Sequence, residues 1–430
     1  MRMLHACGKY ILAGAATLAA LASLDPAHAG LRVLHAFDRS DGDNPEGALV
    51  EDSVGNLYGT TVSGGSGGGT VFKLAPDGTE SVLHSFTGGS DGSEPVGLIM
   101  DEAGNLYGTT RYGGSAGCEG SGCGTVFKLA PDGTETVLYA FAGENDGTFP
   151  NSGVIEDKAG NLYGTTDEGG NTGCGYGCGT VFKLAPSGTE TVLYAFTGGS
   201  DGATPSAGLI EDSTGNLYGT TYQGGNNSCT DGFGCGTVFK IAPDGTETTL
   251  YTFKGGTDGG TPDSALIADS AGNFYGETSE GGGTGCSGYG CGTVFELAAD
   301  GTETVLYSFC RKRGCSDGAG PSAGLISDKA GNLYGTTEGG GSGSCGIGED
   351  LGCGTIFEVA PEGTETVLHA FLNVMSHGYD PGGLMRDKEG HLIGTTEEGG
   401  IRSCGGFPGR SGSPPAFHPR GCGIVFRFEK

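Results

Sequence analysis

One stretch of the sequence, residues 101–141, is the unit from which almost the whole chain is copied. It reads DEAGNLYGTTRYGGSAGCEGSGCGTVFKLAPDGTETVLYAF. An interval of about 50 to 60 residues between copies is typical of an array of supersecondary units. The asparagine of its Gly-Asn pair marks each of seven copies, with a histidine in the last one: Asn56, Asn105, Asn161, Asn216, Asn273, Asn332 and His391.

Each copy contains four short segments with strand character. In the second copy these are residues 97–100, 106–110, 125–130 and 134–141, separated by the turn Asp101 to Gly104, a Gly-rich loop and the turn Pro131-Asp132-Gly133. Alternating β-branched and aromatic residues favour strands, and the Pro and Gly residues favour tight turns. Four antiparallel strands repeated radially describe a propeller blade, so we predict an all-β protein, a seven-bladed β-propeller.

The two ends of the repeated region support a closed ring over an open solenoid. The last copy stops after its third segment, residues 423–430, whereas residues 31–37 (LRVLHAF) match the fourth segment of the other copies. The N-terminal strand can therefore complete the seventh blade by pairing with residues 425–429. Closure of this kind removes the exposed sheet edges of an open array.

The run Asp-x-x-Gly-Asn-Leu-Tyr-Gly-Thr-Thr, followed by a Gly-rich spacer and Gly-Thr-Val-Phe-Lys-Leu-Ala-Pro-Asp-Gly-Thr-Glu, recurs over residues 31–430. It resembles the GloVer repeat of choice-of-anchor tandem-repeat bacterial surface proteins. More distantly, it is similar to NHL-type propeller repeats. The resemblance implies an exported propeller-like protein and supplies no established activity. The sequence departs from the family name in one respect, because no anchor segment follows Lys430.

Residues 1–29 have the features of a secretory signal peptide. Arg2 and Lys9 precede an apolar run, and Ala27-His28-Ala29 is a cleavage site of the A-x-A kind. The apolar run is too short for a stable membrane span, so we expect none in the mature chain. We therefore expect a secreted protein, periplasmic or extracellular, with residues 30–430 forming a single propeller domain that is a monomer.

The cysteines predict a set of disulfides. The chain has 15 cysteines, and all but Cys7 fall into neighbouring pairs, six of which bracket the loop between the second and third strands of a copy. Paired cysteines in an exported chain favour disulfides over zinc ligation, because no histidine accompanies each pair. The predicted pairs are Cys118 with Cys123, Cys174 with Cys178, Cys229 with Cys235, Cys286 with Cys291, Cys310 with Cys315, Cys345 with Cys353, and Cys404 with Cys422.

One face of the propeller is predicted to carry the function. The loops between second and third strands and the loops between blades emerge on the same face, and both vary between copies, whereas the tight turns of the other face are nearly invariant. Variable loops on a rigid scaffold are where binding usually resides. The loops between blades share the motif Asp-Gly-x-x-Pro, whose aspartates are candidate calcium ligands or, alternatively, caps of the turn. These are Asp41, Asp91, Asp146, Asp201, Asp258 and Asp317.

The charge of the chain excludes several classes of partner. With 22 basic and 51 acidic residues the net charge is −29, which repels nucleic acid, anionic membranes and polyanionic substrates. Part of this acidity is ordinary solvation of turns. Several acidic residues near the ends of the second strands should nevertheless gather at the loop face: Asp167, Glu168, Glu280, Glu338, Glu397 and Glu398.

The last two copies depart from the repeat, by terminal drift or for a function. The predicted binding residues there are Tyr379, Arg402, Arg410 and Arg420, together with Glu397 and Glu398, and the sixth copy inserts Arg311, Lys312 and Arg313. No nucleophile elbow, zinc-protease motif or phosphate loop occurs. His35, His84 and His369 replace a tyrosine of the other copies, so we interpret them as strand positions and not as ligands.

Two functions fit these features. The first is a non-catalytic binding or scaffold module whose disulfide-pinned loops contact an unknown extracellular ligand, glycan or protein. The alternative is a propeller glycoside hydrolase or polysaccharide lyase, with His377, Asp380 and His418 as candidate acid and base groups. Convergence of acidic and histidine side chains in one pocket would distinguish the enzyme from the binding module. The sequence indicates no cofactor, with calcium as the one possibility.

Overall fold

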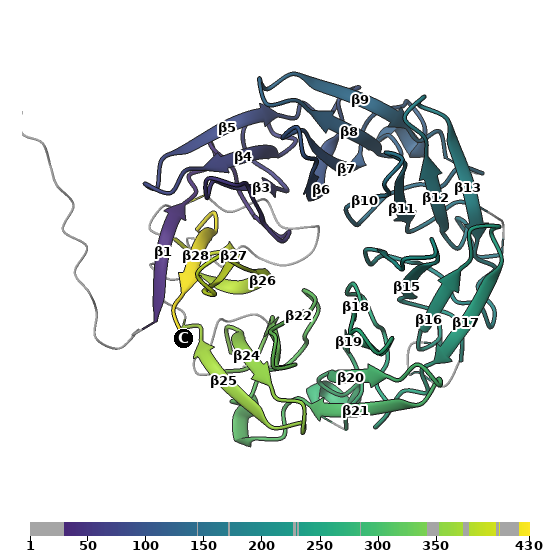
Figure 1. The fold of residues 1–430 in the computed structure, drawn as a ribbon, viewed down its shortest axis with the longest axis vertical. Helices are drawn as coiled ribbons and strands as arrows, with labels where there is room; N and C mark the ends of the chain where they lie inside the picture. The colour runs from purple at the N-terminus through teal and green to yellow at the C-terminus, as the bar shows by residue number, and fades with distance from the viewer. Residues whose placement is uncertain are drawn as a thin grey trace, which may run out of the picture.

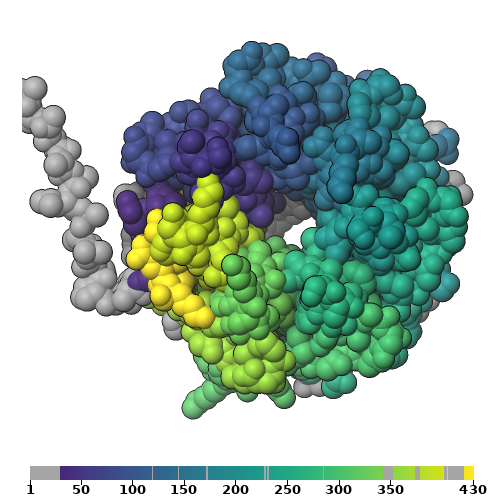
Figure 2. All heavy atoms as spheres, in the orientation of Figure 1, coloured from purple at the N-terminus to yellow at the C-terminus, as the bar shows by residue number. Residues whose placement is uncertain are grey.

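The protein is a seven-bladed ring of four-stranded antiparallel sheets around a central hollow (Figures 1 and 2). This computed structural model describes residues 30–143, 145–170, 173–226, 229, 232–283, 285–341, 352–372, 378–400, 404 and 421–430. The leader predicted at residues 1–29 lies outside this part of the chain. No helix within the described residues is long and apolar enough to span a membrane.

The first four blades each use four consecutive strands, ordered from the centre of the ring outward. They are blade 1, β2 (Val50–Glu51), β3 (Leu57–Thr61), β4 (Thr70–Leu74) and β5 (Glu80–Ser85); blade 2, β6 (Ser93–Met100), β7 (Leu106–Tyr112), β8 (Thr125–Leu129) and β9 (Glu135–Ala140); blade 3, β10 (Ile155–Glu156), β11 (Leu162–Thr166), β12 (Thr180–Leu184) and β13 (Glu190–Ala195); and blade 4, β14 (Ile210–Glu211), β15 (Leu217–Thr221), β16 (Thr237–Ile241) and β17 (Glu247–Thr252).

Blades 5 and 6 follow the same order, and blade 7 combines strands from both ends of the chain. The described loops also contain three short 3-10 helices. These elements are blade 5, β18 (Ile267–Ala268), β19 (Phe274–Thr278), β20 (Thr293–Leu297) and β21 (Glu303–Ser308); blade 6, β22 (Ile326–Ser327), β23 (Leu333–Thr337), β24 (Thr355–Val359) and β25 (Glu365–Ala370); blade 7, β26 (Tyr379–Arg386), β27 (Leu392–Glu398), β28 (Ile424–Phe428) and β1 (Leu31–Ala36); and the helices η2 (Cys118–Gly120), η3 (Cys286–Gly288) and η4 (Arg313–Cys315).

The predicted closure of the ring is confirmed. Strand β1 pairs antiparallel with β28, with Leu31 opposite Phe428 and Ala36 opposite Ile424. The N-terminal strand therefore supplies the outer edge of blade 7, and Figure 1 shows β1 beside β28. Blade 7 therefore has four strands like the other blades, although its strands come from both ends of the chain.

Neighbouring blades are joined by one repeated aromatic contact. The phenylalanine that follows the outer strand of each blade meets a phenylalanine in the third strand of the next blade, edge to face, with ring centroids 4.9 to 5.6 Å apart. Edge-to-face pairs contribute about 0.5–1.5 kcal/mol each beyond the area that they bury. The pairs are Phe37–Phe72, Phe86–Phe127, Phe141–Phe182, Phe196–Phe239, Phe253–Phe295, Phe309–Phe357 and Phe371–Phe426.

The Asp-x-x-Gly-Asn turns form one face of the ring, which we call the turn face. In blade 6, Asp328 accepts hydrogen bonds from the backbone N–H groups of Ala330 and Asn332, the Asn332 amide and the Tyr334 hydroxyl, at 2.8 to 3.0 Å. The same set recurs at Asp52, Asp101, Asp157, Asp212 and Asp269. In blade 7, His391 replaces the asparagine and contacts Asp387 at 2.8 Å. These turns satisfy their own polar groups.

The opposite face, called the loop face here, contains the loops between blades and those between second and third strands. The two loop classes lie side by side, as predicted. Antiparallel bridges join each junction loop to the end of a second strand, for example Thr148 to Glu168 and Ala203 to Gln223. Variation in these loops therefore occurs within one continuous surface.

Candidate functional site

The predicted disulfides are present on the loop face. The structure pairs Cys118 with Cys123, Cys174 with Cys178, Cys229 with Cys235, Cys286 with Cys291, Cys310 with Cys315, and Cys404 with Cys422. Cys353 is also disulfide-bonded, and its predicted partner Cys345 lies outside the described residues. The loops between second and third strands are therefore pinned at their bases in blades 2 to 5 and in blade 7.

Three of these pinned loops present an aromatic side chain to solvent. Tyr176, Phe233 and Tyr289 are 76%, 66% and 47% exposed. Each stands two residues before the second cysteine of its loop, in blades 3, 4 and 5. Its carbonyl accepts a hydrogen bond of 2.8 to 2.9 Å from the glycine that follows the second strand, so the three sites are equivalent in three consecutive blades. Exposed aromatic residues held by a rigid backbone are suited to binding.

A cavity of about 930 Å³ lies beside the first of these aromatic residues. Tyr112, Phe149 and Tyr176 line it, together with Glu168 and the disulfide loop at Cys118. The Tyr112 and Phe149 rings are 5.3 Å apart. An apolar hollow with a few polar groups is the usual form of a ligand site, so this cavity between blades 2 and 3 is a candidate ligand site on the pinned surface.

The centre of the loop face has a repeated and strained backbone. The residue before every junction proline has positive φ, between 53° and 65°, including the β-branched Thr204 and Thr261. Such residues avoid this conformation unless their surroundings impose it. Here the surroundings include the disulfides, because the N–H of Phe149, Thr204 and Thr261 donates to the carbonyl of Cys123, Cys178 and Cys235 of the preceding blade. The disulfide loops therefore hold the inner rim as well as themselves.

We call the centre of the loop face the axial mouth. It consists of two sets of side chains: those directly before or after a junction proline, and those directly after the Thr-Thr pair of a second strand. Glu46, Glu338, Glu397 and Asp380 of blades 1, 6 and 7 belong to it. Burial raises the pKa of Glu397 to about 9, and the charges of Asp380, Glu46 and Glu338 add to the effect. Burial, with Glu94 and Glu338, also raises the pKa of Glu46. Carboxylates from different blades thus converge at the centre of the ring.

The other side of the axial mouth contains a basic residue. Arg111 of blade 2 lies near Asp167 of blade 3, a carboxylate that is only 8% exposed. Burial raises the pKa of Asp167 to about 7, and Arg111 opposes this rise. The guanidinium of Arg111 also lies over the Tyr112 ring, 5.5 Å from its centroid. Arg111 therefore connects the axial mouth with the aromatic cavity.

Blade 5 holds a buried carboxyl where most other blades have threonine. In blades 2 and 3 this threonine donates to a carbonyl of the next blade, Thr109 to Ser152 at 2.7 Å and Thr165 to Ala207 at 3.1 Å. Glu277 takes the position in blade 5, is fully buried, and accepts the Gly324 N–H at 2.9 Å. Burial raises its pKa to about 8. The side chain is therefore a neutral acid at physiological pH.

The six candidate calcium aspartates each close a junction turn. Asp146 and Asp201, for example, accept a backbone N–H from four residues earlier at 2.8 and 2.7 Å, and a tyrosine hydroxyl at 2.9 and 3.1 Å. Asp41, Asp91, Asp258 and Asp317 likewise accept a backbone N–H. This geometry supports the alternative interpretation, in which the aspartate caps the turn.

The predicted residues of the last two blades separate into two places. Tyr379 donates to Glu398, and Asp380 and Glu397 meet at the axial mouth. Lys312 instead lies at the junction of blades 5 and 6, where its Nζ is 2.7 Å from Glu365 of β25. Arg311 lies over Tyr307 at 5.8 Å from the ring centroid, and Arg313 is exposed. His377, Arg402, Arg410, His418 and Arg420 lie outside the described residues.

Comparison with known proteins identifies the repeat. The model of the Gloeobacter/Verrucomicrobia repeat matches residues 10–233 and 171–408. The chain belongs to the Gloeobacter/Verrucomicrobia repeat family. This match confirms the predicted resemblance to GloVer repeats. A comparison with curated proteins finds no match.

Solved structures similar to this Gloeobacter/Verrucomicrobia repeat protein support the fold alone. Virginiamycin B lyase from Staphylococcus aureus superposes with a TM-score of 0.57 at 12% identity, over 92% of this chain and 98% of the other. The extracellular domain of a protein assigned as a hybrid two-component system from B. thetaiotaomicron gives 0.52 at 13% identity, over 93% of this chain and 41% of the other. At such low identity neither similarity assigns an activity.

Sequence reasoning missed several residues of the loop face. Tyr176, Phe233 and Tyr289 were not singled out, nor were Glu46, Arg111 and Glu277. A signal for all of them exists in the aligned copies. Glu46 and Arg111 directly follow a recurring proline and a recurring threonine, the three aromatic residues stand two positions before a cysteine, and Glu277 replaces the threonine of the other six copies.

Proposed function

We propose that this protein is an exported, non-catalytic binding module that takes up an extracellular ligand on its disulfide-pinned loop face. The observation that carries the proposal is the row of exposed aromatic side chains, Tyr176, Phe233 and Tyr289, at equivalent positions on pinned loops of three consecutive blades. Rigid loops lose little conformational entropy on binding, so such a surface binds efficiently.

A neutral glycan chain is the ligand that fits this surface best. Aromatic faces stack on the apolar faces of sugar rings, and tyrosine can do so in a chain that has no tryptophan. The net charge of −29 disfavours anionic polysaccharides and nucleic acid. The surrounding Gly, Ser and Asn residues offer short polar groups for sugar hydroxyls. An extracellular protein partner is the competing ligand.

The proposal is tested by screening the mature chain, residues 30–430, against an array of neutral and acidic glycans. We expect binding to at least one neutral glycan. Binding should weaken about tenfold or more in the variant Tyr176→Ala/Phe233→Ala/Tyr289→Ala, in line with the energetic weight of exposed aromatic anchors. Val54→Ala is the matched control, because Val54 is an exposed apolar residue of the turn face, 72% accessible. Binding that survives the triple substitution would overturn the proposal.

A glycan-cleaving enzyme is the second candidate, favoured by one observation at the axial mouth. Glycoside hydrolysis needs a protonated carboxylic acid beside an ionised carboxylate. Glu397, whose pKa is raised to about 9, has a second carboxyl group, that of Asp380, beside it. Release of reducing ends from a neutral polysaccharide by the wild type, lost in Glu397→Gln, would favour the enzyme. Glycan binding without any cleavage would favour the binding module.

A further inference from the structure

A group of metal-ligand side chains lies where the ring closes, away from the axial mouth and the aromatic loops. It consists of His35 on β1, Asp41 in the loop after β1, and Glu80 at the start of β5. One ligand atom from each residue lies within 4.8 Å of the others, and His35 Nε2 is 3.1 Å from Asp41 Oδ2. We propose that His35, Asp41 and Glu80 bind a divalent transition-metal ion such as Zn²⁺, and that this ion stabilises the ring where its two ends meet.

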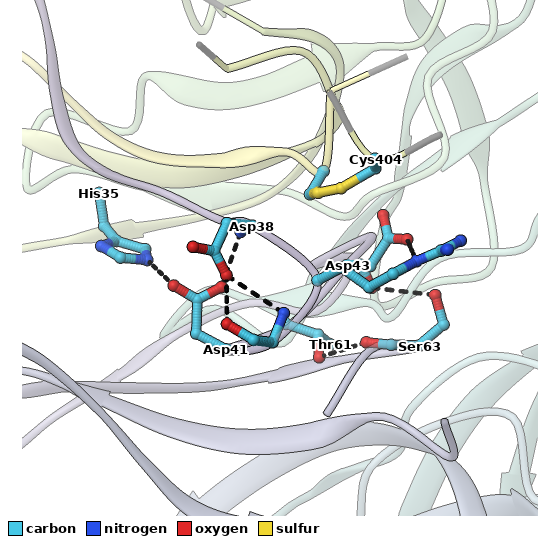
Figure 3. Close-up of a disulfide and its surroundings, with 10 residues drawn as sticks. His35, Asp38, Asp41, Asp43, Thr61, Ser63 and Cys404 are labelled. Carbon is cyan, nitrogen blue, oxygen red and sulfur yellow. Dashed lines mark hydrogen bonds and ion pairs between the residues drawn. A yellow bond between two sulfur atoms is a disulfide. The ribbon is translucent and has the colours of Figure 1, made fainter. Parts of the chain in front are cut away.

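Two of the three ligands are held in place by the protein. The backbone N–H of Asp38 donates to Asp41 Oδ1 at 2.7 Å, which turns Oδ2 toward the imidazole of His35 (Figure 3). The His35 ring packs edge to face on Phe37, 4.8 Å between centroids. Ligands that share a zinc ion at about 2.0–2.2 Å lie roughly 3 to 4 Å from one another. The 3.1 Å separation already has this value.

Glu80 supplies the third ligand and a polar atom that needs a partner. Its Oε1 is buried and has no hydrogen-bond partner within the described residues. A divalent cation would neutralise the facing carboxylates and satisfy this oxygen in one step.

The side chains around the junction aspartate differ at other blade junctions, although the matching glutamate oxygen of Glu135, Glu190, Glu303 and Glu365 is also buried without a hydrogen-bond partner within the described residues. Tyr139 and Tyr194, which replace His35 there, donate a phenolic proton to the junction aspartate. At the junction of blades 5 and 6, the Lys312 ammonium contacts Glu365. A similar group on the turn face, Asp387 with His391, is already contacted by Arg427. At the closure junction an imidazole faces two carboxylates instead.

The donor atoms select the class of metal. A histidine nitrogen with two carboxylate oxygens suits zinc and its first-row neighbours, whereas calcium takes six to eight oxygen ligands. The ligands come from β1, which closes the ring, from the junction loop and from the outer strand of blade 1. Metal bound here would therefore join the N-terminal strand to blade 1, in addition to its pairing with β28.

The next junction provides a matched control. His84 takes the place of His35, but its Nε2 is 3.8 Å from Asp91. Asp91 already accepts the Thr87 N–H at 2.8 Å and the Thr87 hydroxyl at 2.6 Å. The substitution His35→Tyr should remove a metal ligand and restore the residue of other blades, so it should fold. His84→Tyr makes the same change where no metal is proposed.

The test is calorimetric titration of Zn²⁺ into untagged, EDTA-stripped residues 30–430, repeated with Co²⁺ to record the visible absorption of bound cobalt. We expect one strong site in the wild type and in His84→Tyr, with affinity lowered at least about tenfold in His35→Tyr and in Glu80→Gln. EDTA should lower the thermal midpoint of the wild type and leave that of His35→Tyr unchanged. The proposal is wrong if the wild type takes up no Zn²⁺, if both variants bind it equally well, or if His84→Tyr loses it as well.

Discussion

The turn face and the loop face of the ring are built from the same repeat, yet they use it in opposite ways. On the turn face, the aspartate of each Asp-x-x-Gly turn accepts hydrogen bonds from its own turn, as at Asp328. On the loop face, the residues before the prolines hold a strained backbone, buried carboxylates have raised pKa values, and aromatic side chains face solvent. Strain and unsatisfied polarity persist only where the surrounding fold imposes them, and they often mark function.

The largest expected effect on stability concerns Glu277, the buried carboxyl group that replaces a threonine of the other blades. Glu277→Gln keeps an acceptor for the Gly324 N–H and removes a buried titrating group. Because the folded pKa is raised from 4.5 to about 8, the unfolded chain releases this proton near pH 4.5 and the folded chain retains it. Stability therefore falls as pH rises from 4.5 to 8, and the substitution should recover roughly 3 to 4 kcal/mol near pH 8 and little at pH 4.

Urea unfolding of both proteins at pH 4.5 and pH 7.5 measures this difference. Glu190→Gln is the control. The pKa of Glu190 is raised to about 7, but its side chain is only half buried, so the gain should be smaller. An equal gain for Glu277→Gln at both pH values would contradict the assignment of a buried neutral acid.

The second prediction tests the turn face. Asp328→Ala removes the acceptor for four hydrogen bonds and should lower the free energy of unfolding by roughly 3 kcal/mol at pH 7. Burial alone would raise the pKa of Asp328, but its bonds to Asn332 and Tyr334 lower it to about 2. This contribution is present above pH 4 and is lost as pH falls toward 2. Lys329→Ala, in the same exposed turn, should change stability by less than about 0.5 kcal/mol.

The prediction fails if both substitutions have equal effects, because the turn would then not depend on its carboxylate. Thermal or urea denaturation followed by circular dichroism provides the measurement for both variants. The comparison between Asp328 and Lys329 sharpens the contrast between the faces, since it separates an internal acceptor from an ordinary surface charge.

The third and smallest effect concerns the pinned loops. Replacing Cys174 and Cys178 by serine opens one short loop and should cost about 2 kcal/mol in the chain-entropy model. The β signal in circular dichroism should persist while proteolysis near Tyr176 increases. Because the Cys178 carbonyl accepts the Thr204 N–H, hydrogen exchange at Thr204 should also accelerate. Loss of the whole β signal would mean that the disulfides hold the ring and not the loop face.

Almost all of the ring could be predicted from the sequence, because the patterns that indicate its strands and turns involve residues close together in the chain. Strand alternation, the Pro-Asp-Gly turns and the offset between residues 31–37 and 423–430 depend on neighbours in the chain, so they can be found without coordinates. The disulfide pairs were predicted for the same reason, because each links cysteines a few residues apart.

The candidate site was predicted less well, because it depends on contacts between blades. Asp380, Glu397 and Glu398 were named, but their partners Glu46 and Glu338 come from other copies far along the chain. His35 was assigned a strand position, which β1 confirms, yet its approach to Asp41 and Glu80 arises only when the first and last blades meet. The binding role of Lys312 stays a prediction, and its contact with Glu365 joins two segments more than 50 residues apart, which the sequence alone could not reveal.

Oxidative footprinting of the tyrosines, with and without a bound neutral glycan, tests the central claim most directly. Tyr176 and Tyr289 stand on the loop face, and Tyr107 stands on the turn face, where its hydroxyl donates to Asp101. The account predicts that the glycan protects Tyr176 and Tyr289 from oxidation and leaves Tyr107 unchanged. Protection of Tyr107 with no change at Tyr176 and Tyr289 would place the ligand on the turn face and contradict it.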